Sequence, residues 1–409
     1  MSSVRLTIAG LAGGGRGVSR HAGAVWLVAG ALPGEVVEAV AERRRAGVVE
    51  ARAVEVRERS PWRAEGICPA AGSCGGCDLA HVAAAARPAV LREVTRGALR
   101  HAPPALAELV SSARMVAGSG ENWRLRARLH WDPDANTLGF RRARSHRVTR
   151  IHSCRAISLR LSALLPELEA RLAQAALPPG ELEWLEDLDG ARAVVGFRGP
   201  GWLPPFRGLD GFWRLLRRGS AEGWGATGVT MALPIPLAVP VGAFFQGNRA
   251  LVPALFRRVA ELVRGSGVQR VVDLYGGVGF FAAAARAAGV EDITLVEGNA
   301  VAAAAARVNL PGVRVVAGSC EAFVGREGVG GERLVIVDPP RAGLSPQVRQ
   351  ALARGRPAWV LLLSCDAGRF GRDAAALGAA GYHCCEIELW DMFPLTHHVE
   401  ILALFRPSP

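Results

Sequence analysis

Apolar runs alternate with alanine-rich segments in the C-terminal part of the chain, from about residue 231 onward. Uninterrupted apolar runs separated by helix-like segments are typical of parallel strands that are buried on both faces of a sheet. The strand candidates, which are mainly apolar, cover residues 270–275, 292–297, 313–317, 334–338, 359–364, 383–390 and 398–405. The last two follow each other without room for a helix, which predicts a seven-stranded, Rossmann-like α/β sheet that ends in an antiparallel pair.

The N-terminal part has a different pattern, with short stretches in which apolar and polar residues alternate. These stretches cover residues 4–8, 24–28, 35–40 and 51–56, and turn signals lie between them at residues 13–17 and 33–34. Five or so short strands at this spacing predict a small, OB-like β-barrel over residues 1–58.

Residues 59–230 are harder to interpret, and we expect a cysteine-rich loop, a helix over about 82–100 and a mixed α+β domain. Within residues 123–130, Arg124, Arg126 and Arg128 alternate with other residues, so a strand would carry all three on one face. That face is interpreted either as a solvated surface or as a contact with RNA. Residues 231–409 then form the third domain.

The charge of the chain favours a polyanionic partner. Basic residues outnumber acidic residues 49 to 37, the net charge is +12, and every basic side chain is an arginine because the chain has no lysine. Guanidinium groups bind phosphate in a bidentate way and stack on bases, so RNA is the expected partner. A GC-rich genome explains the missing lysine but explains the net charge less readily.

The chain has no feature of a membrane protein. None of its apolar runs reaches the roughly 18 residues that a membrane span needs, and its N-terminus lacks a signal-peptide pattern. We therefore expect a cytoplasmic protein that acts as a monomer and has no membrane partner.

A cofactor site is predicted where the first strand of the C-terminal sheet ends. The segment Asp273-Leu-Tyr-Gly-Gly-Val-Gly-Phe280 joins this strand to a helix, and its glycines let the backbone approach a ligand. Glu297 ends the next strand, where a carboxylate accepts ribose hydroxyl protons. A nicotinamide enzyme fits these two features as well. The loop Asp338-Pro-Pro-Arg341 favours a methyltransferase instead, and its lack of an aromatic residue after the prolines argues against methylation of an exocyclic amine.

A candidate nucleophile follows the fifth strand, in the segment Ser364-Cys365-Asp366. The carboxyl edge of an open α/β sheet is where ligands bind, so a thiol there is well placed to react. The alternative is a buried structural cysteine, which is the commonest state of a free cysteine.

Several motifs together resemble the RNA 5-methyluridine methyltransferase family, whose domain has the expected sheet. They are Phe244-Phe-Gln-Gly-Asn248, Asp273-Leu-Tyr-Gly-Gly-Val-Gly279, Val337-Asp-Pro-Pro-Arg-Ala-Gly343, Ser364-Cys-Asp366 with Arg372-Asp373, and Asp391-Met-Phe-Pro-Leu-Thr-His-His-Val-Glu400. At the N-terminus, Gly13-Gly-Gly-Arg-Gly-Val18 and Gly30-Ala-Leu-Pro-Gly-Glu-Val36 are similar to the RNA-binding TRAM domain of many members.

This resemblance implies a cofactor and a role for each site residue. S-adenosylmethionine is the implied cofactor, and the residues that would contact it are Gln246, Tyr275, Glu297 and Asp338. Cys365 would be the nucleophile and Glu400 the base. The chemistry is consistent, because carbon 5 of uracil becomes nucleophilic only after a thiolate adds at carbon 6, and a base must later remove the carbon 5 proton.

The sequence departs from the family pattern at three places. Phe280 stands where many relatives have a polar asparagine, and Gly276 replaces a cysteine or another small residue. The segment after Asp366 lacks the usual proline.

Four cysteines outside the catalytic motif are candidate metal ligands. Cys68, Cys74 and Cys77 have C-x5-C-x2-C spacing, and Cys154 lies far downstream. Four thiolates bind either zinc or an iron–sulfur cluster, and spacing alone does not decide. Similarity to family members that carry a four-iron, four-sulfur (4Fe-4S) cluster, with His81 following the cysteines, implies a structural cluster. Cys320, Cys384 and Cys385 are expected to be buried.

The sequence indicates the chemical reaction more clearly than it indicates which RNA is the substrate. Family members that have both the barrel and the four cysteines mostly modify large-subunit ribosomal RNA, so 23S rRNA is expected and tRNA is the alternative. A catalytically inactive RNA-binding assembly factor is a second alternative, against which the presence of both Cys365 and Glu400 counts. A 5-methylcytidine enzyme is a third, although such enzymes usually place the cysteine after proline or threonine.

Overall fold

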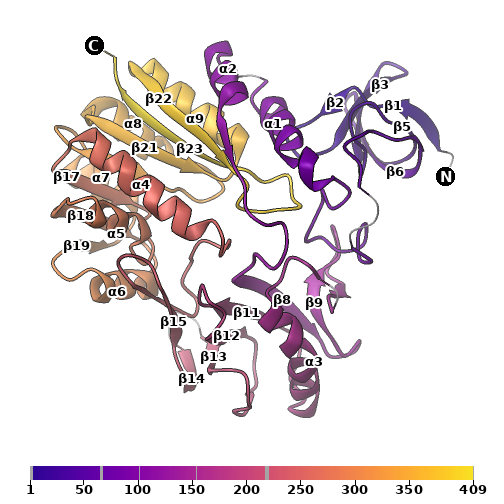
Figure 1. Ribbon diagram of the computed structural model, residues 1–409, viewed down its shortest axis with the longest axis horizontal. Helices are drawn as coiled ribbons and strands as arrows, with labels where there is room; N and C mark the ends of the chain where they lie inside the picture. Colours follow the sequence, from indigo (N-terminus) through magenta and orange to yellow (C-terminus); the bar gives the residue numbers. More distant parts are fainter. Residues whose placement is uncertain (1–2, 65–67, 101, 153, 217–220, 409) are drawn as a thin grey trace.

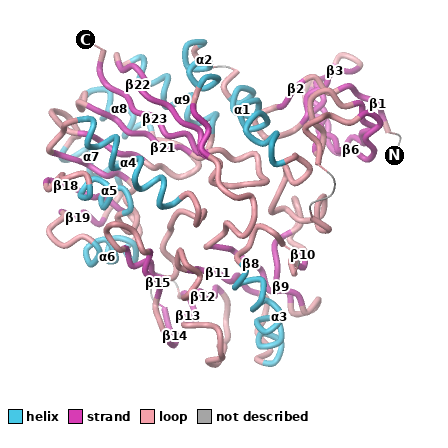
Figure 2. The backbone as a smooth tube through the Cα atoms, in the orientation of Figure 1, coloured by secondary structure: helices cyan, strands magenta, loops and turns pink. Residues whose placement is uncertain are grey.

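The computed structural model describes residues 3–64, 68–100, 102–152, 154–216 and 221–408. Figure 1 shows three regions: the N-terminal strands, a central sheet with helix α3 beside it, and a large C-terminal sheet flanked by helices. Figure 2 shows that long loops connect the central region to the other two. None of the helices in the described part of the chain is both long and apolar enough to cross a membrane.

The N-terminal strands form a six-stranded sheet with the order β1-β5-β6-β4-β3-β2. The strands are β1 (Val4–Thr7), β2 (Gly10–Leu11), β3 (Gly17–His21), β4 (Ala24–Ala29), β5 (Val36–Arg45) and β6 (Val48–Glu58). Strands β1 and β2 are consecutive in the chain yet stand at opposite ends of this order, so the sheet curls into a barrel. Its core includes Leu6, Trp26 and Val37. This curved sheet is consistent with the small barrel that the sequence predicts.

Two helices follow the cysteine-rich segment. A single 3-10 turn, η1 (Ala84–Ala86), leads into α1 (Arg87–Ala98), which confirms the helix predicted over about 82–100, and α2 (Pro104–Ser112) comes next. The apolar face of α1 packs against Leu11 and Leu32 of the barrel and against Leu79 of the cysteine-rich segment. Helix α1 therefore joins the barrel to the rest of the protein.

The central region is a seven-stranded, mostly antiparallel sheet, with α3 (Leu159–Gln174) packed on one face. Its order is β10-β9-β8-β11-β12-β13-β14. The strands are β8 (Arg126–Asp132), β9 (Thr137–Arg141), β10 (Val148–Arg150), β11 (Gly180–Glu186), β12 (Ala193–Arg198), β13 (Gly211–Leu215) and β14 (Ala221–Gly225). A hairpin of β15 (Gly228–Met231) and β16 (Leu237–Pro240) leads to the C-terminal sheet. These elements match the expected α+β character.

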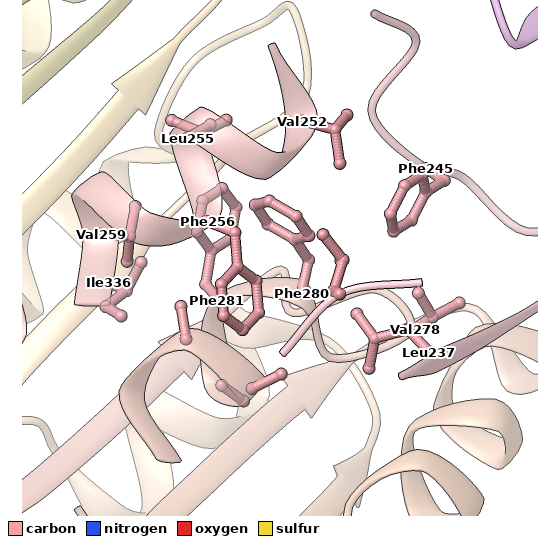
Figure 3. Packing of buried hydrophobic residues seen from close by; sticks show 14 of the residues in the cluster. Leu237, Phe245, Val252, Leu255, Phe256, Val259, Val278, Phe280, Phe281 and Ile336 are labelled. Atoms are coloured by element: carbon pink, nitrogen blue, oxygen red, sulfur yellow. The ribbon is translucent and has the colours of Figure 1, made fainter. Parts of the chain in front are cut away.

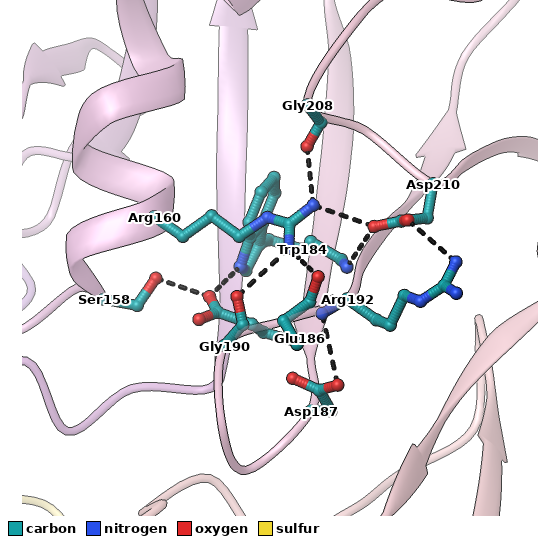
Figure 4. Close-up of polar contacts among 11 residues, drawn as sticks. Ser158, Arg160, Trp184, Glu186, Asp187, Gly190, Arg192, Gly208 and Asp210 are labelled. Atoms are coloured by element: carbon teal, nitrogen blue, oxygen red, sulfur yellow. Dashed lines mark hydrogen bonds and ion pairs between the residues drawn. The ribbon is translucent and has the colours of Figure 1, made fainter.

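The buried carboxylate of Glu186 connects several segments of the central region (Figure 4). Glu186 is fully buried and accepts hydrogen bonds from the Ser158 hydroxyl and from Trp184 Nε1. It also pairs with Arg249 at 2.6 Å. Because Arg249 directly follows the Phe244–Asn248 motif, this pair fixes one end of the motif on the central sheet.

The alternating arginines of residues 123–130 correct one expectation. Arg126 donates hydrogen bonds to the carbonyl groups of Phe245 and Ala243, at 2.9 Å and 3.1 Å. Arg124 is likewise only partly exposed, and of the three only Arg128 is a well-exposed side chain, with Glu181 as its partner. A solvated face is therefore wrong for two of the three residues, because segments distant in the sequence cover them.

The C-terminal sheet has the order β19-β18-β17-β20-β21-β23-β22-β7. Its seven predicted strands are β17 (Arg270–Leu274), β18 (Asp292–Glu297), β19 (Arg314–Ala317), β20 (Leu334–Val337), β21 (Trp359–Ser364), β22 (Tyr382–Trp390) and β23 (Glu400–Pro407). Strands β17 to β21 are parallel, and β23 runs antiparallel to both neighbours, as predicted.

The expectation of seven strands needs one correction, because an eighth strand extends this sheet. Strand β7 (Arg114–Val116) pairs in parallel with β22. It comes from the segment before the central sheet, and three residues are too short to give a periodic signal.

Helices cover both faces of the C-terminal sheet. On one face lie α4 (Val252–Ser266), α5 (Phe280–Ala287) and α6 (Ala300–Asn309). On the other lie α7 (Cys320–Glu327), α8 (Pro346–Gly355) and α9 (Ala367–Ala379). Figure 3 shows Phe280 among the apolar residues of the first face. Its ring lies 5.7 Å from those of Phe245 and Phe256, so the residue that replaces the family's asparagine is part of the core.

Candidate active site

The glycine-rich turn after β17 is held by two carboxylates. Asp273 is fully buried, and its Oδ2 accepts a hydrogen bond from Ala282 N, 3.0 Å away at the start of α5. Burial raises the pKa of Asp273 well above its usual range, and the neighbouring carboxyls of Asp338 and Glu297 add to the shift. A Cβ at Gly276 would lie 2.5 Å from the Leu295 side chain, so the turn requires glycine there.

Glu297 ends β18 next to this turn. Its Oε2 accepts from Gly277 N at 2.8 Å, and its Oε1 accepts from Asn299 N at 2.5 Å. A carboxylate has about four acceptor positions, so Glu297 keeps capacity for ligand hydroxyl groups. Tyr275 stands in the same turn with φ +62°, and burial raises the pKa of its phenol.

Gln246 and Asp338 meet although they come from different regions. Gln246 Nε2 donates to Asp338 Oδ2 at 3.1 Å, and Gln246 is buried. Burial raises the pKa of Asp338 to about 7, and the hydrogen bond from Gln246 opposes this shift. The structure therefore places Gln246 and Asp338 together, at the sheet edge that also carries Glu297.

Cys365 and Glu400 lie side by side at the same edge. Cys365 directly follows β21, Glu400 begins β23, and these neighbouring strands pair Ser364 with Ile401. Burial raises the pKa of the Cys365 thiol to about 12, and Glu400 and Asp338 add to this effect, whereas Arg341 opposes it. The thiol is half-buried rather than enclosed in the core.

Glu400 is buried and its carboxyl is not fixed by other side chains. Its Oε2 is buried and has no hydrogen-bond partner among the described residues. Burial raises the pKa of Glu400 well above its usual range, Asp338 raises it further, and Arg341 lowers it. A carboxyl with a raised pKa beside a thiol has the properties of a proton-accepting group near neutral pH.

The loop that leads into Glu400 is anchored by residues that the sequence analysis did not single out. Asp391 is buried and forms an ion pair with Arg87 of α1. Asn248, fully buried at the end of the Phe244–Asn248 motif, donates from Nδ2 to the carbonyl oxygen of Met392 at 3.3 Å. The sequence hinted at a role for Asn248 and Asp391 only through their membership of the Phe244–Asn248 and Asp391–Glu400 motifs. No such signal pointed to Arg87.

The four candidate metal ligands line one cavity of about 580 Å³. Cys68, Cys74, Cys77 and Cys154 are all free thiols, and burial raises the pKa of Cys77 to about 12. The cysteine-rich segment lies on the central sheet, where Gly75 N donates to the carbonyl oxygen of Arg141 at 2.9 Å. Among the described residues, no three histidine, cysteine or acidic side chains are close enough to hold a single metal ion.

A buried arginine faces the same cavity. The guanidinium of Arg124 lies over the rings of Trp123 and Phe140, at 4.6 Å and 5.4 Å from their centroids. Burial lowers the pKa of Arg124, whereas Cys77, Cys154 and Cys74 raise it. Its Nε has no hydrogen-bond partner within the described ranges. A buried cation without a carboxylate partner is costly, so this cavity suits an anionic group.

The remaining cysteines only partly match the expectation. Cys320 is buried and Cys384 is half-buried, but Cys385 is exposed, which corrects the prediction. The pairing of β22 with β23 shifts between Cys384 and Glu386, and this bulge turns Cys385 toward solvent.

Comparison with known proteins identifies relatives along the whole chain, although no protein-family model matches it. A 23S rRNA (uracil(1939)-C(5))-methyltransferase RlmD from Chromohalobacter salexigens is 34% identical, with 99% of this chain and 90% of that protein covered. The enzyme of the same name from Halomonas elongata is 32% identical, covering 98% of this chain and 89% of that protein. The one from Shewanella sp. strain MR-7 is 29% identical, over 96% and 93%.

A solved structure has the same fold. The Pyrococcus abyssi tRNA (uracil-54, C5)-methyltransferase, in complex with S-adenosyl-L-homocysteine, superimposes with a TM-score of 0.76. The match covers 98% of this chain and all of that one at 24% identity, which supports the fold alone. The relatives above 30% identity extend over nearly the full length of both proteins. The chain therefore belongs to the family of 23S rRNA (uracil-C5)-methyltransferases.

Proposed function

We propose that the protein transfers a methyl group from S-adenosylmethionine to carbon 5 of a uridine in 23S rRNA. The observation that carries this proposal is the placement of Cys365 beside the buried carboxyl of Glu400 at the carboxyl edge of the sheet. The relatives named as 23S rRNA enzymes favour ribosomal RNA over tRNA.

The proposed reaction assigns one task to each of the two groups. The Cys365 thiolate adds to carbon 6 of uracil, and the resulting enolate takes the methyl group at carbon 5. Glu400 removes the carbon 5 proton, and the electrons of that C–H bond re-form the 5,6 double bond as the thiolate leaves. Arg341, whose charge lowers the pKa of both Cys365 and Glu400, favours the ionised form of each group.

Four residues are proposed to bind S-adenosylmethionine, which supplies the methyl group. Glu297 is suited to accept ribose hydroxyl protons, because it stands at the end of β18 beside the glycine-rich turn. Gln246 and Asp338 lie between this turn and Cys365, which is where the methyl-donating end would lie. Tyr275 is assigned to the cofactor through its place in the turn.

Two further assignments concern the N-terminal half. We propose that residues 1–58 are a TRAM-like RNA-binding barrel, residues 59–230 a central domain and residues 231–409 the methyltransferase domain. We also propose that Cys68, Cys74, Cys77 and Cys154 hold a 4Fe-4S cluster. Support comes from their shared cavity and from buried Arg124, whose charge would offset the anionic cluster formed with four thiolates. The cluster would join residues 68–77 to Cys154 without taking part in methyl transfer.

The function is tested by incubating the purified protein with methyl-labelled S-adenosylmethionine and with transcripts of 23S rRNA or tRNA. We expect labelled 5-methyluridine in the 23S transcript. Label confined to tRNA would contradict the RNA assignment, and labelled 5-methylcytidine would contradict the base. No label in either RNA would favour an inactive assembly factor. Mapping 5-methyluridine in a strain that lacks the protein would identify the modified position.

A further inference from the structure

The cysteine-rich segment is fastened directly to the loop that leads into Glu400. Asp78 follows Cys77, and its Oδ1 accepts a hydrogen bond from the backbone N of His397 at 2.9 Å. Its Oδ2 forms a second hydrogen-bond contact, with Nδ1 of the same histidine. Next to this pair, Leu79 N donates to the carbonyl oxygen of Leu395 at 2.9 Å. Three interactions thus hold residues 395–397, immediately before Val399 and Glu400.

The N-terminal barrel also contacts His397 and Leu79, through Gly15. A Cβ on Gly15 would lie 2.8 Å from His397 Cβ and 3.3 Å from Leu79 Cδ2, so only glycine fits against them. Gly15 also has φ +69°, which a residue with a side chain rarely adopts. The glycine-rich turn of the barrel is therefore packed against the Asp78–His397 pair.

The contact continues toward the catalytic groups. The rings of His397 and His398 are in contact, with centroids 4.2 Å apart and their planes tilted by 36°. His398 is half-buried, and the charges of Arg341 and Asp366 act on it. Only Val399 separates His398 from Glu400 in the chain, so His397 of the Asp78–His397 pair lies three positions before the candidate base.

Glu400 is the first residue of β23, where it pairs with Trp390 of β22, and the loop before it leads directly into this strand. Its Oε2 accepts no hydrogen bond from the described residues, so no side chain donor orients that oxygen. The loop is anchored at its far end by Arg87 and Asn248, which hold residues 391–392. The end of the loop nearer Glu400 is held by the Asp78–His397 pair.

We propose that Asp78 and His397 are positioning residues for proton removal from carbon 5. By fixing residues 395–397 they hold Glu400 where it reaches the C–H bond, and they make its placement depend on the cysteine-rich segment. The inference rests on the proposed role of Glu400 as the base. A displacement of about 1 Å at a reacting group costs up to about 100-fold in rate.

Single-turnover measurements on a 23S rRNA transcript with methyl-labelled S-adenosylmethionine test this proposal. Two rates are followed: formation of a labelled RNA–protein adduct that survives denaturing gels, and release of free methylated RNA. For Asp78→Ala we expect release to slow by about 10- to 100-fold, so that adduct accumulates. Adduct formation and S-adenosylhomocysteine affinity should stay within about twofold, because neither requires the base.

Further variants separate positioning from stability. Asp78→Asn keeps an acceptor for His397 N and should restore part of the release rate. His397→Ala removes only the ring contact and keeps the backbone hydrogen bond to Asp78, so it should slow release less than Asp78→Ala. Combining Asp78→Ala with His397→Ala should add little to Asp78→Ala alone, since Asp78→Ala already removes both contacts. Asp134→Ala, at an exposed turn residue, is the control and should leave both rates unchanged.

Measuring Glu400→Gln in parallel distinguishes the positioning role of Asp78 and His397 from the proposed role of Glu400 as the base. Trapped adduct with Glu400→Gln but normal release with Asp78→Ala would overturn the inference alone. Normal release with Glu400→Gln would overturn the role of Glu400, and the positioning role with it. Equal losses of cofactor affinity, adduct formation and release in both Asp78 variants would show a general structural effect and also overturn the inference.

Discussion

Ser364 pairs with Ile401 across β21 and β23, and this register sets the thiol of Cys365 beside the carboxyl of Glu400. Cys365 and Glu400 are 35 positions apart in the sequence. Because the strands are antiparallel, the end of one and the start of the other meet at the same edge of the sheet. Their proximity is therefore a property of the sheet and does not depend on a flexible loop alone.

This arrangement predicts that substitutions of Cys365 and Glu400 stop the reaction at different steps. Cys365→Ala should bind S-adenosylmethionine and RNA but form no covalent adduct, because no thiolate is present to add at carbon 6. Glu400→Gln should add to the uracil and transfer the methyl group but release product about 100- to 10,000-fold more slowly, as expected for loss of a general base. Denaturing gels with methyl-labelled cofactor measure both outcomes. A stable adduct from Cys365→Ala, or near-normal turnover by Glu400→Gln, would contradict the assigned roles.

The buried carboxyl of Glu400 also predicts how stability varies with pH. In the folded protein the pKa of Glu400 is raised well above 4.5, so above that pH the unfolded chain releases a proton that the folded protein keeps. Stability from this group is therefore complete below pH 4.5 and is lost as pH rises toward the folded-state pKa. Glu400→Gln removes this dependence, so its melting temperature relative to wild type should increase from pH 5 to pH 8. A constant difference across this range would show that Glu400 ionises normally.

The cysteine cavity predicts the metal content of protein purified without air. We expect a brown protein with about four iron and four sulfide ions per chain. Cys74→Ser and Cys77→Ser should lose both and melt at lower temperature, because the cluster joins two segments of the fold. The exposed Cys385 provides a matched control, and Cys385→Ser should retain the iron. One equivalent of zinc in colourless wild-type protein would rule out the cluster.

The barrel predicts the salt dependence of RNA binding. Arg43 and Arg45 are exposed at the end of β5, and within the described part of the chain neither has an ion pair. If both contact phosphates of single-stranded RNA, replacing them with alanine should reduce the slope of log affinity against log salt by about 1.4. Filter binding over a range of salt concentrations measures this slope. Arg354→Ala, on the distant helix α8, should leave it unchanged, and an unaltered slope in the Arg43/Arg45 variant would exclude the barrel tip from the RNA interface.

The parallel strands and the site motifs were predictable because their signals are local. Each strand from β17 to β21 is a short, mainly apolar segment that ends in a glycine, acidic or cysteine motif, and the fold brings those ends to one edge. The contact of Gln246 with Asp338 could be expected only through family resemblance, since no periodicity relates them.

The features that sequence analysis missed depend on long-range contacts. Arg126 has the same local pattern as exposed Arg128, but the carbonyl groups that bury it belong to residues 243 and 245. Asp78 and His397 are separated by more than 300 positions, and each alone resembles an ordinary surface residue. No local pattern encodes such pairs, because the partner is defined only by the folded chain.

Strand β7 has a consequence for how the protein is made. It is synthesised early, but its partner β22 is completed only when residue 390 has emerged from the ribosome. Arg87 likewise precedes its partner Asp391 by 304 positions. The N-terminal half therefore leaves the ribosome with strand β7 unpaired and Arg87 without its carboxylate partner. The last twenty or so residues supply Asp391 and also Glu400, which completes the catalytic edge of the sheet. A gene fragment that encodes residues 231–409 alone would leave the β22 edge open, and open edges promote aggregation.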